Sequence, residues 1–307
     1  MAALPEETWN AMLEDWLKMK RHEGLAFKTM TKLERFADLT RPYLGDKQVQ
    51  AITPQDILET CREQERKGCY ENSIRVLSLC RHVVRRSIIL GVADRDVTAS
   101  VRDALATPRS KRYAAITDKK EVGRLMKAID GLTGRYVTKA GLQLTALTFL
   151  RSKELREARW SEVRFEDALW TIPMERMKSD RDHHVPLADQ SVVILKTLHS
   201  LTAHKGQFIF ASSHRGGRPI SGATMNNALK DLGYTSERHV PHGFRTPAST
   251  NLNELNWNSD WIEKQLAHEE RNSTRRAYNR SEYLPDRRRT MQAYADWLDE
   301  ARSLASE

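Results

Sequence analysis

Four segments far apart in the chain carry cationic, imidazole or phenolic side chains of the kinds used in phosphoryl transfer. Any one of them alone is typical of an ordinary protein surface, so the observation is the whole set. His242 and Arg245 are three residues apart, which places them on one side of a helical turn. The complete set is Arg151, Lys178, His242, Arg245, His268 and Tyr278.

This set has the composition that phosphoryl transfer without a metal requires. Such a reaction needs cations that neutralise the transition state, a nucleophilic side chain and a proton donor for the leaving oxygen. Arginine grips two phosphate oxygens at once, a geometry that lysine lacks. Two arginines, a lysine, two histidines and a tyrosine therefore indicate transfer at a phosphate with no cofactor.

A metal site is the competing interpretation of the segment SDRDHHVP. It offers Asp180, Asp182, His183 and His184. Adjacent histidines in a strand point to opposite faces, so both cannot readily ligate one ion, and the spacing matches no usual ligand pattern. The chain also has no H-x-x-x-H motif and no Walker loop. We therefore predict that no metal is bound.

Composition places these residues in a basic globular protein. Hydrophobic residues make up 39% of the 307 positions and charged residues 30%, with a net charge of +9. No apolar run is long enough for a membrane span, and the N-terminus lacks a secretory signal, so we expect a cytoplasmic, nucleoid-associated protein. A basic surface attracts polyanions. Three unpaired cysteines predict reduced thiols, at least one in a helical core: Cys61, Cys69 and Cys80.

The first hundred residues are predicted to be helical throughout. Apolar residues at helical spacing run from Trp9 to Leu17, and a second such stretch ends near Pro42. Thr53 and Pro54 are typical of a helix N-terminus. In the following helix the apolar side is expected to comprise Ile74, Leu77, Val84, Ile88 and Ile89.

Basic residues in this region are candidates for DNA contact. Those on the last helix could equally form a solvated face, and the sequence leaves both interpretations open. Residues 106–116 contain a proline and several bases, which indicates an exposed linker suited to a DNA backbone. The candidates are Arg75, Arg81, Arg85 and Arg86 on the helix, and Arg109, Lys111 and Arg112 in the linker.

The remainder of the chain, residues 117–307, is predicted to be mainly helical with a small antiparallel sheet. Helices are expected over 118–130 and 136–150. Strands are expected over 168–173 and 183–187, joined by a polar hairpin turn, and 207–212 is expected to be a strand or extended. Further helices are expected over 221–232, 243–255, 258–267, 272–279 and 285–303. The fold class is therefore mainly α, with a helical domain (1–105), a linker and a mixed α+β domain.

In this order the motifs resemble the tyrosine recombinase family. The order is T-x-L-R-x-x-E-L, a lysine in a β-hairpin, H-x-x-R, L-x-H and a tyrosine ten residues on. The segments HGFRTPASTNLNE and IEKQLAHEERNSTRRAYNR resemble the integrases of phages and genomic islands that insert beside tRNA genes. The resemblance runs from about residue 4 to about residue 300. It implies a helical core-binding domain followed by a catalytic domain.

The resemblance also implies a role for each residue in cleavage. Arg151 and Arg245 would grip the non-bridging oxygens of the scissile phosphate, and Lys178 would protonate the departing 5′-hydroxyl. Tyr278 would form a 3′-phosphotyrosyl link, which preserves the energy of the phosphodiester. His242 would assist proton transfer at the tyrosine, and His268 would hydrogen-bond the phosphate.

Partners follow from the same resemblance. They are double-stranded DNA at attachment sites, three further copies in a tetramer, an excisionase and a host DNA-bending protein. The tail helix with Trp297 and Leu298 would pack either against a neighbouring subunit or within its own chain. Integrases of this branch usually begin with an arm-binding domain, and this sequence begins almost at the core-binding domain.

Pro247 departs from the family pattern. A helix beginning near Pro241 would place this proline beyond the first turn, where it would leave the carbonyl of Gly243 unpaired. A helix beginning near Arg245 would accommodate it at little cost. The first arrangement is favoured, because Phe244, Ala248 and Leu252 already follow a helical repeat.

Two other functions compete with a catalytic recombinase. One is a DNA-binding remnant of an integrase with little or no recombination activity. The other is a type IB topoisomerase, which shares the catalytic logic but is disfavoured by the integrase-like N-terminal domain and tail. Retention of all six catalytic-type residues favours the recombinase.

Overall fold

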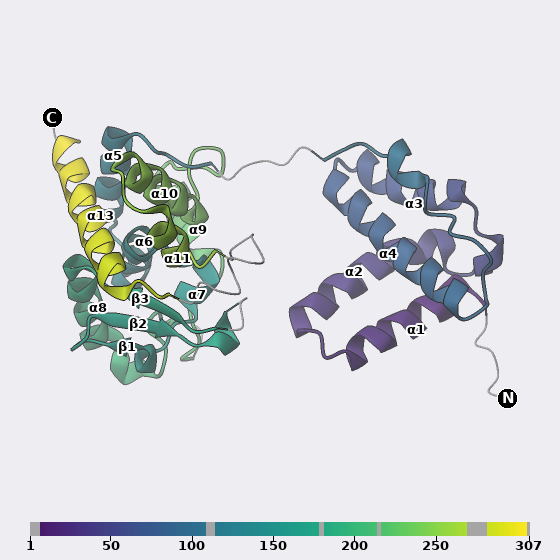
Figure 1. Cartoon of the computed structure of the whole chain (residues 1–307), viewed down its shortest axis with the longest axis horizontal. Helices are drawn as coiled ribbons and strands as arrows, with labels where there is room; N and C mark the ends of the chain where they lie inside the picture. Colours follow the sequence, from purple (N-terminus) through teal and green to yellow (C-terminus); the bar gives the residue numbers. More distant parts are fainter. Residues whose placement is uncertain (1–6, 109–113, 178–180, 214–215, 269–280, 306–307) are drawn as a thin grey trace. The chain divides into compact units, whose positions relative to one another are not determined.

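The structure is a computed structural model that describes residues 7–108, 114–177, 181–213, 216–268 and 281–305. The chain forms two compact units, Met1–Lys111 and Arg112–Glu307 (Figure 1). Each unit has its own hydrophobic core. No helix within the described ranges is both long and apolar enough to cross a membrane.

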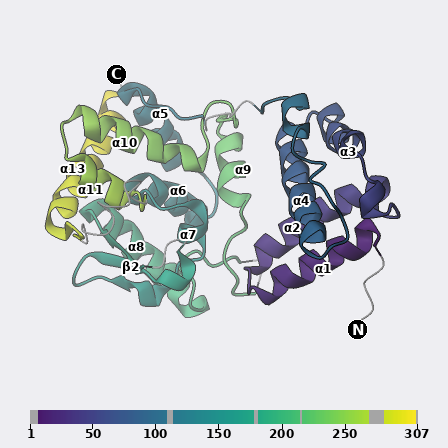
Figure 2. The same ribbon diagram turned by 45° about the vertical axis from the view of Figure 1, so that its right-hand side comes forward.

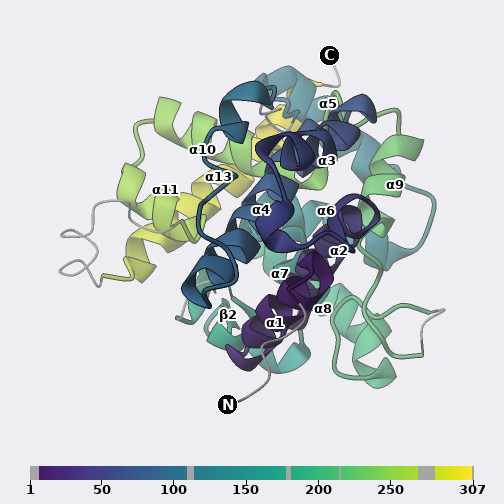
Figure 3. The same ribbon diagram turned by 90° about the vertical axis from the view of Figure 1, so that its right-hand side faces the viewer.

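The first unit is built from helices whose apolar sides meet in one core. Figure 3 turns the ribbons of these helices towards the viewer. Trp9 and Leu13 are fully buried, and Trp9 Nε1 donates to the buried Thr40 hydroxyl at 2.9 Å. The predicted helical repeat of this segment is thus confirmed. The described elements are α1 (Trp9–His22), α2 (Phe27–Leu44), α3 (Pro54–Arg66) and α4 (Tyr70–Ile89), with 3-10 turns at Val49–Ala51 and Val101–Ala104.

Side-chain caps mark the starts of α1 and α3, and two predictions need correction. Thr53 caps α3 in a reciprocal box with Asp56, as its sequence indicates. Pro42 does not end α2, because a proline only two residues before the last helical position removes a single hydrogen bond and the helix continues to Leu44. Ile89 is 77% exposed and lies outside the core, since α4 ends there. Cys61 and Cys80 are buried, as predicted for at least one thiol.

The second unit combines helices with one small sheet. The strands run antiparallel in the order β1-β2-β3, and β2 pairs with β3 through Thr171 opposite His184 and Ile172 opposite His183. This confirms the predicted β-hairpin. The described elements are α5 (Lys119–Asp130), α6 (Tyr136–Thr148), α7 (Ser152–Arg156), β1 (Val163–Arg164), β2 (Leu169–Ile172), β3 (His183–Pro186), α8 (Asp189–Thr202), α9 (Thr224–Asp231), α10 (Arg245–Glu254), α11 (Ser259–Gln265) and α13 (Leu284–Leu304), with 3-10 turns at Trp160–Glu162, Met174–Arg176, Ala203–Lys205 and Pro241–Phe244.

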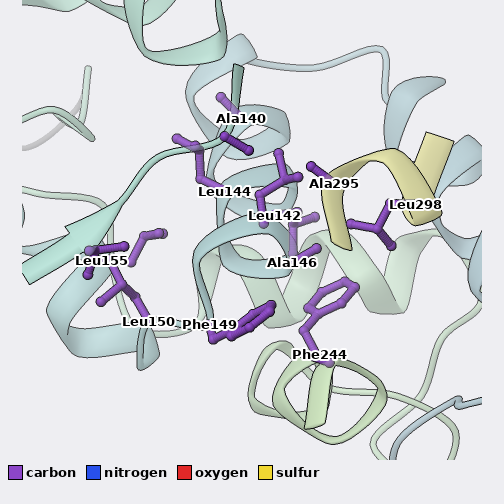
Figure 4. Packing of buried hydrophobic residues seen from close by; sticks show 14 of the residues in the cluster. Ala140, Leu142, Leu144, Ala146, Phe149, Leu150, Leu155, Phe244, Ala295 and Leu298 are labelled. Atoms are coloured by element: carbon purple, nitrogen blue, oxygen red, sulfur yellow. The ribbon is translucent and has the colours of Figure 1, made fainter. Parts of the chain in front are cut away.

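Helix α6 is the centre of this unit. It contacts α5, α8, α9 and α13, and it lies inside the second unit in Figure 2. Leu142 and Ala146 are fully buried beside Ala295 and Leu298 of α13, with Phe149 just beyond the helix end (Figure 4). The buried positions of α6 are apolar or carry hydroxyl groups bonded to the helix backbone, whereas its half-buried Lys139 and Gln143 hydrogen-bond to Asp130 of α5. The candidate site begins just after the C-terminus of α6.

The tail helix α13 packs within its own unit. Trp297 is 8% exposed and Leu298 is 1% exposed, and the main partner of α13 is α5. The two backbones approach so closely that a Cβ on Gly123 would lie 1.9 Å from the carbonyl oxygen of Ala301. Of the two arrangements that the sequence left open, the structure has the one within the chain.

The structure has one helix that was not predicted and one segment less regular than a strand, and a further predicted helix is untested. Helix α8 was not among the predictions, because its β-branched run Val192–Ile194 has no clear helical pattern. Residues 207–212 form only isolated bridges, from Phe208 to Arg159 and from Ala211 to Pro219, and are not a strand of the sheet. The predicted helix 272–279 lies outside the described residues.

Candidate active site

Arg151 begins a short helix whose first turn fixes its side chain. Helix α6 ends at Thr148, and Phe149 is left-handed, with φ of 62°, so the chain turns before α7. Arg151 is the N-cap of α7 and follows the apolar helix α6, as predicted. Glu154 is 6% exposed and accepts from Arg151 N at 2.9 Å and from Arg151 Nη1 at 2.8 Å. A charge-assisted contact of this kind orients the guanidinium.

Arg245 is the more deeply buried of the two arginines, at 7% exposure. It begins α10, and its Nη1 donates to the carbonyl oxygen of Phe149, while its Nη2 donates to that of Leu266 at 2.6 Å. Arg151 Nη2 donates to the next carbonyl, that of Ala267, at 3.1 Å. The two predicted arginines are therefore held on consecutive carbonyls at the end of α11.

The electrostatics of this pair of arginines favour an anion beside them. Burial, followed by repulsion from Arg151, lowers the pKa of Arg245 to about 10, so it stays charged at neutral pH. Glu154 is the buried carboxylate nearest to them and contacts Arg151. Two like charges held together in a partly desolvated place gain energy when an anion such as a phosphate binds between them.

His268 also lies just after the C-terminal end of α11, where it adds an imidazole beside the two arginines. Its Nε2 is 3.0 Å from Arg245 Nη2, and its Nδ1 is 2.7 Å from a carboxylate oxygen of Glu263. A guanidinium can only donate, so Nε2 accepts and the proton resides on Nδ1, which donates to Glu263. Glu263 thereby sets the tautomer and the ring orientation, as a carboxylate does for many functional histidines.

His242 lies on the turn that precedes Arg245. This turn is a 3-10 segment from Pro241 to Phe244, and Phe244 anchors it in the core (Figure 4). Desolvation, together with the charges of Arg245 and Arg151, lowers the pKa of His242. A neutral imidazole can accept a proton, which is the property that the proposed role of His242 requires.

Pro247 is the third residue of α10 and therefore lies in its first turn. The α-helix begins at Arg245, directly after the 3-10 turn Pro241–Phe244, and not near Pro241 as favoured. Backbone N–H groups in a first helical turn have no intrahelical acceptor, and a proline there loses no such bond.

The segment that follows the linker packs against the 3-10 turn that carries His242. The N–H of Ile116 donates to His239 Nδ1 at 3.3 Å, and Asn251 Nδ2 donates to the carbonyl of Thr117 at 3.3 Å. A Cβ on Gly243 would lie 2.5 Å from the carbonyl oxygen of Ala114. Glycine is therefore required at the centre of the H-x-x-R motif for this close approach.

The hairpin that carries Lys178 is anchored at its base beside Arg151. Arg176 Nη1 donates to Glu162, and Arg176 Nη2 donates to the carbonyl of Glu154, the residue whose side chain holds Arg151. On the other side of the turn, Asp182 accepts from the N–H of Met174 at 2.9 Å. Lys178 itself lies outside the described residues, and Arg176, two residues before it, contacts the residue that holds Arg151.

The two histidines of β3 point to different surroundings. His183 is 5% exposed, and burial together with the charge of Arg287 holds its pKa well below the ordinary range. His184 contacts the Thr171 hydroxyl through Nδ1 at 3.1 Å. The ring of His183 is thus a neutral core group.

The remaining predicted residues lie elsewhere or outside the described ranges. On α4, Arg75 pairs with Glu71 at 2.9 Å and Arg85 with Asp96 at 3.3 Å. Pairs this exposed contribute little stability. Arg86 pairs with Asp15 at 2.9 Å, and Arg81 lies on the same helix, half-buried. Outside the described residues lie Arg109, Lys111, Arg112 and Tyr278.

Sequence reasoning missed the acids that orient the cationic cluster. Glu154 had a signal, because a glutamate three residues after an N-cap is the usual reciprocal partner in a capping box. Glu263 and Glu162 had none, since their partners are distant in sequence or depend on the turn of the chain after α11.

Comparison with known proteins places both units in one family. Residues 115–284 match the Phage integrase family, and residues 9–104 match the Phage integrase central domain. The integrase of Shigella phage Sf6 is 32% identical over 299 residues, which covers 97% of this chain and 77% of the relative. The integrase of Enterobacteria phage P4 is 31% identical over 306 residues, which covers 95% of this chain and 67% of the relative.

Solved structures show the same fold at lower identity. A lambda integrase dimer bound to a COC′ core site superposes with a TM-score of 0.70 at 19% identity, covering 86% of this chain and 96% of that one. The Tn1549 transposon integrase in complex with circular intermediate DNA gives 0.67 at 15% identity, covering 88% and 95%. With domain matches across both units and phage relatives above 30% identity over nearly its whole length, the chain belongs to the phage integrase family of tyrosine recombinases.

Proposed function

We propose that the protein is a site-specific recombinase that cleaves and rejoins DNA through a 3′-phosphotyrosyl intermediate, and so integrates or excises a prophage or genomic island. The observation that carries the proposal is the convergence of Arg151 and Arg245 on the consecutive carbonyls of Leu266 and Ala267, with His268 on Arg245. Family membership makes DNA the expected source of the phosphate.

In the proposed step, the phenolic oxygen of Tyr278 attacks the phosphorus and the 5′-oxygen leaves. The phenolic proton passes to His242, and Lys178 supplies a proton to the 5′-oxygen. Arg151 and Arg245 bind the non-bridging oxygens, and preorganised cations of this kind stabilise the charge of the transition state. Attack by a 5′-hydroxyl reverses the step and rejoins the strand without ATP.

His268 would donate to the same phosphate, which requires a change from the present arrangement. Its Nε2 now accepts from Arg245, while Nδ1 donates to Glu263. In that role Nε2 would carry a hydrogen and would turn from Arg245 to the phosphate, while Glu263 keeps the ring oriented through Nδ1. Glu263 is thus proposed to support His268 in catalysis.

The first unit is proposed to bind the DNA backbone as the core-binding domain. The α4 arginines and the linker bases Arg109, Lys111 and Arg112 are its candidate contacts. The ion pairs of Arg75 and Arg85 are exposed and could exchange for phosphates at small cost. We also propose that the protein acts in the cytoplasm at the nucleoid as a tetramer on two duplexes, aided by an excisionase and a host DNA-bending protein, with a tRNA gene as the insertion site.

A trapped covalent complex tests this proposal. The duplex that the protein protects among fragments of its host element is prepared with a nick beside the cleavage position, so that the cleaved end diffuses away. The parent protein and Tyr283→Phe should form an adduct that survives denaturation, whereas Tyr278→Phe should bind the duplex without forming it. Tyr283 is a matched control because it is the next tyrosine along the chain.

Other outcomes assign the protein to the competing functions. Binding without an adduct in the parent would indicate a DNA-binding remnant. Relaxation of plasmids that lack the protected site would indicate a topoisomerase.

A further inference from the structure

Arg287 is fully buried in the first turn of α13, a location unfavourable for a cation. Burial removes its hydration, and the N-terminus of a helix carries partial positive charge. Its nearest carboxylate oxygen, on Glu282, is 3.7 Å away. An apolar side chain could fill the same space. The presence of a charged guanidinium there therefore needs an explanation, and its hydrogen bonds supply one.

Those hydrogen bonds reach three separate segments. Gln265 Oε1 accepts from Arg287 Nε at 3.1 Å and from Nη2 at 2.7 Å. The carbonyl of His184 accepts from Nη2 at 2.5 Å, and that of Glu282 accepts from Nη1 at 3.1 Å. Gln265 is itself 1% exposed and donates onward to the carbonyl of Thr148 at 3.1 Å.

Each of these segments adjoins a residue of the proposed reaction. Gln265 immediately precedes Leu266 and Ala267, whose carbonyls hold the two arginines. His184 lies on β3, the strand that returns from the turn containing Lys178. Glu282 follows the segment 269–280 that contains Tyr278, so Gln265 and Glu282 flank that segment on its two sides.

We propose that Arg287 is a positioning residue for strand cleavage: one guanidinium joins both flanks of the Tyr278 segment to the strand behind Lys178. The inference rests on the proposed function, because it concerns the nucleophile and the proton donor of that reaction. Arginine suits the task because its planar fork presents five donors in fixed directions, whereas a lysine ammonium cannot reach three such acceptors with the same geometry.

The test compares Arg287→Lys with Arg289→Lys. Arg289 is a matched control on the same helix, with its side chain 70% exposed and paired with Asp286. With the nicked duplex, Arg287→Lys should form the adduct at least tenfold more slowly than the parent, with DNA affinity within about twofold. Arg289→Lys should match the parent. A purely structural role would lower affinity, folded fraction and adduct formation together.

Hydrogen exchange without DNA provides a second measurement that does not depend on activity. In Arg287→Lys, amides of residues 183–185, 264–268, 281–284 and 286 should exchange faster, whereas those of α6 and of the first unit should be unchanged. Should Arg287→Lys fail to fold, Gln265→Met removes one acceptor and keeps the arginine, and the same three segments should loosen.

The inference is overturned if Arg287→Lys forms the adduct at the parent rate, or if exchange increases only in α13 or evenly over the second unit. A parent protein that forms no adduct would instead contradict the proposed function. In that case the exchange result still decides whether Arg287 couples the three segments.

Discussion

Single residues of this site act through partners that the sequence does not display. The cationic residues were predictable from their types and order, and the structure brings Arg151, Arg245 and His268 to the end of α11. Their acceptors are mostly backbone carbonyls, and every residue has a carbonyl, so no pattern identifies the ones used. The burial of Arg287 was unpredictable for the same reason, because a run of three arginines at 287–289 looks like a solvated face.

His239 shows how a residue beside the site makes stability depend on pH. It is 1% exposed, its Nδ1 accepts from the N–H of Ile116, and burial lowers its pKa from 6.5 to about 4. The folded state therefore excludes a proton that the unfolded state binds between these values. The contribution is complete above pH 6.5 and is lost as the pH falls towards 4, by up to about 3 kcal/mol.

Denaturant unfolding of the parent and of His239→Asn between pH 4 and pH 7 measures this dependence. The asparagine retains an acceptor for Ile116 but does not titrate. The free energy of unfolding of the parent, relative to the variant, should fall as the pH is lowered through this window. The exposed His204→Asn should run parallel to the parent. A constant difference between the parent and His239→Asn would contradict the assignment.

At the scale of elements, periodicity predicted the helices that have one apolar side, and capping signals predicted where several begin. The structure confirms the β-hairpin and the ends of α3 and α5 to within a residue or two. Helix α8 was missed because its apolar residues are consecutive and β-branched. The start of α10 was misplaced because a 3-10 turn continues the same apolar spacing into the helix.

The position of Pro247 in its helix determines what its replacement does. In the first turn of α10 it interrupts no intrahelical hydrogen bond, so Pro247→Thr should change the free energy of unfolding by less than about 1 kcal/mol and leave the cleavage rate unchanged. Pro42 is the matched contrast, near the end of α2 and exposed. Pro42→Ala restores a donor for the carbonyl of Asp38 and should stabilise the protein by about 1–2 kcal/mol.

Thermal melts and cleavage rates of both variants beside the parent decide this. A gain in stability from Pro247→Thr as large as that from Pro42→Ala, or faster cleavage, would show that Pro247 disturbs the helix beneath Arg245.

At the scale of the whole molecule, the chain consists of two units, each with a hydrophobic core of its own. The fold class followed from the sequence, since an all-helical stretch is followed by helices mixed with short strands. The tight packing of α13 on α5 did not follow, because it depends on Gly123 at a close approach that one glycine in a helix does not reveal.

The division predicts how DNA binding responds to salt. If unit Met1–Lys111 neutralises phosphates of the backbone, the isolated Arg112–Glu307 unit should bind the protected duplex more weakly than the full chain. Its logarithmic salt dependence should also be shallower, by roughly one unit of slope for each phosphate that the first unit neutralises. Titrations at several salt concentrations measure both. Equal affinity and equal slope would exclude a DNA-binding role for the first unit.

The central claim is that Tyr278 becomes covalently joined to a 3′-phosphate of DNA without a metal. The most direct measurement isolates the adduct formed on the nicked duplex in excess chelator, digests the protein and the DNA, and identifies the modified peptide by mass spectrometry. We expect one nucleotide attached through its 3′-phosphate to Tyr278. Attachment to another residue, attachment through a 5′-phosphate, or an adduct that requires added magnesium would contradict the account.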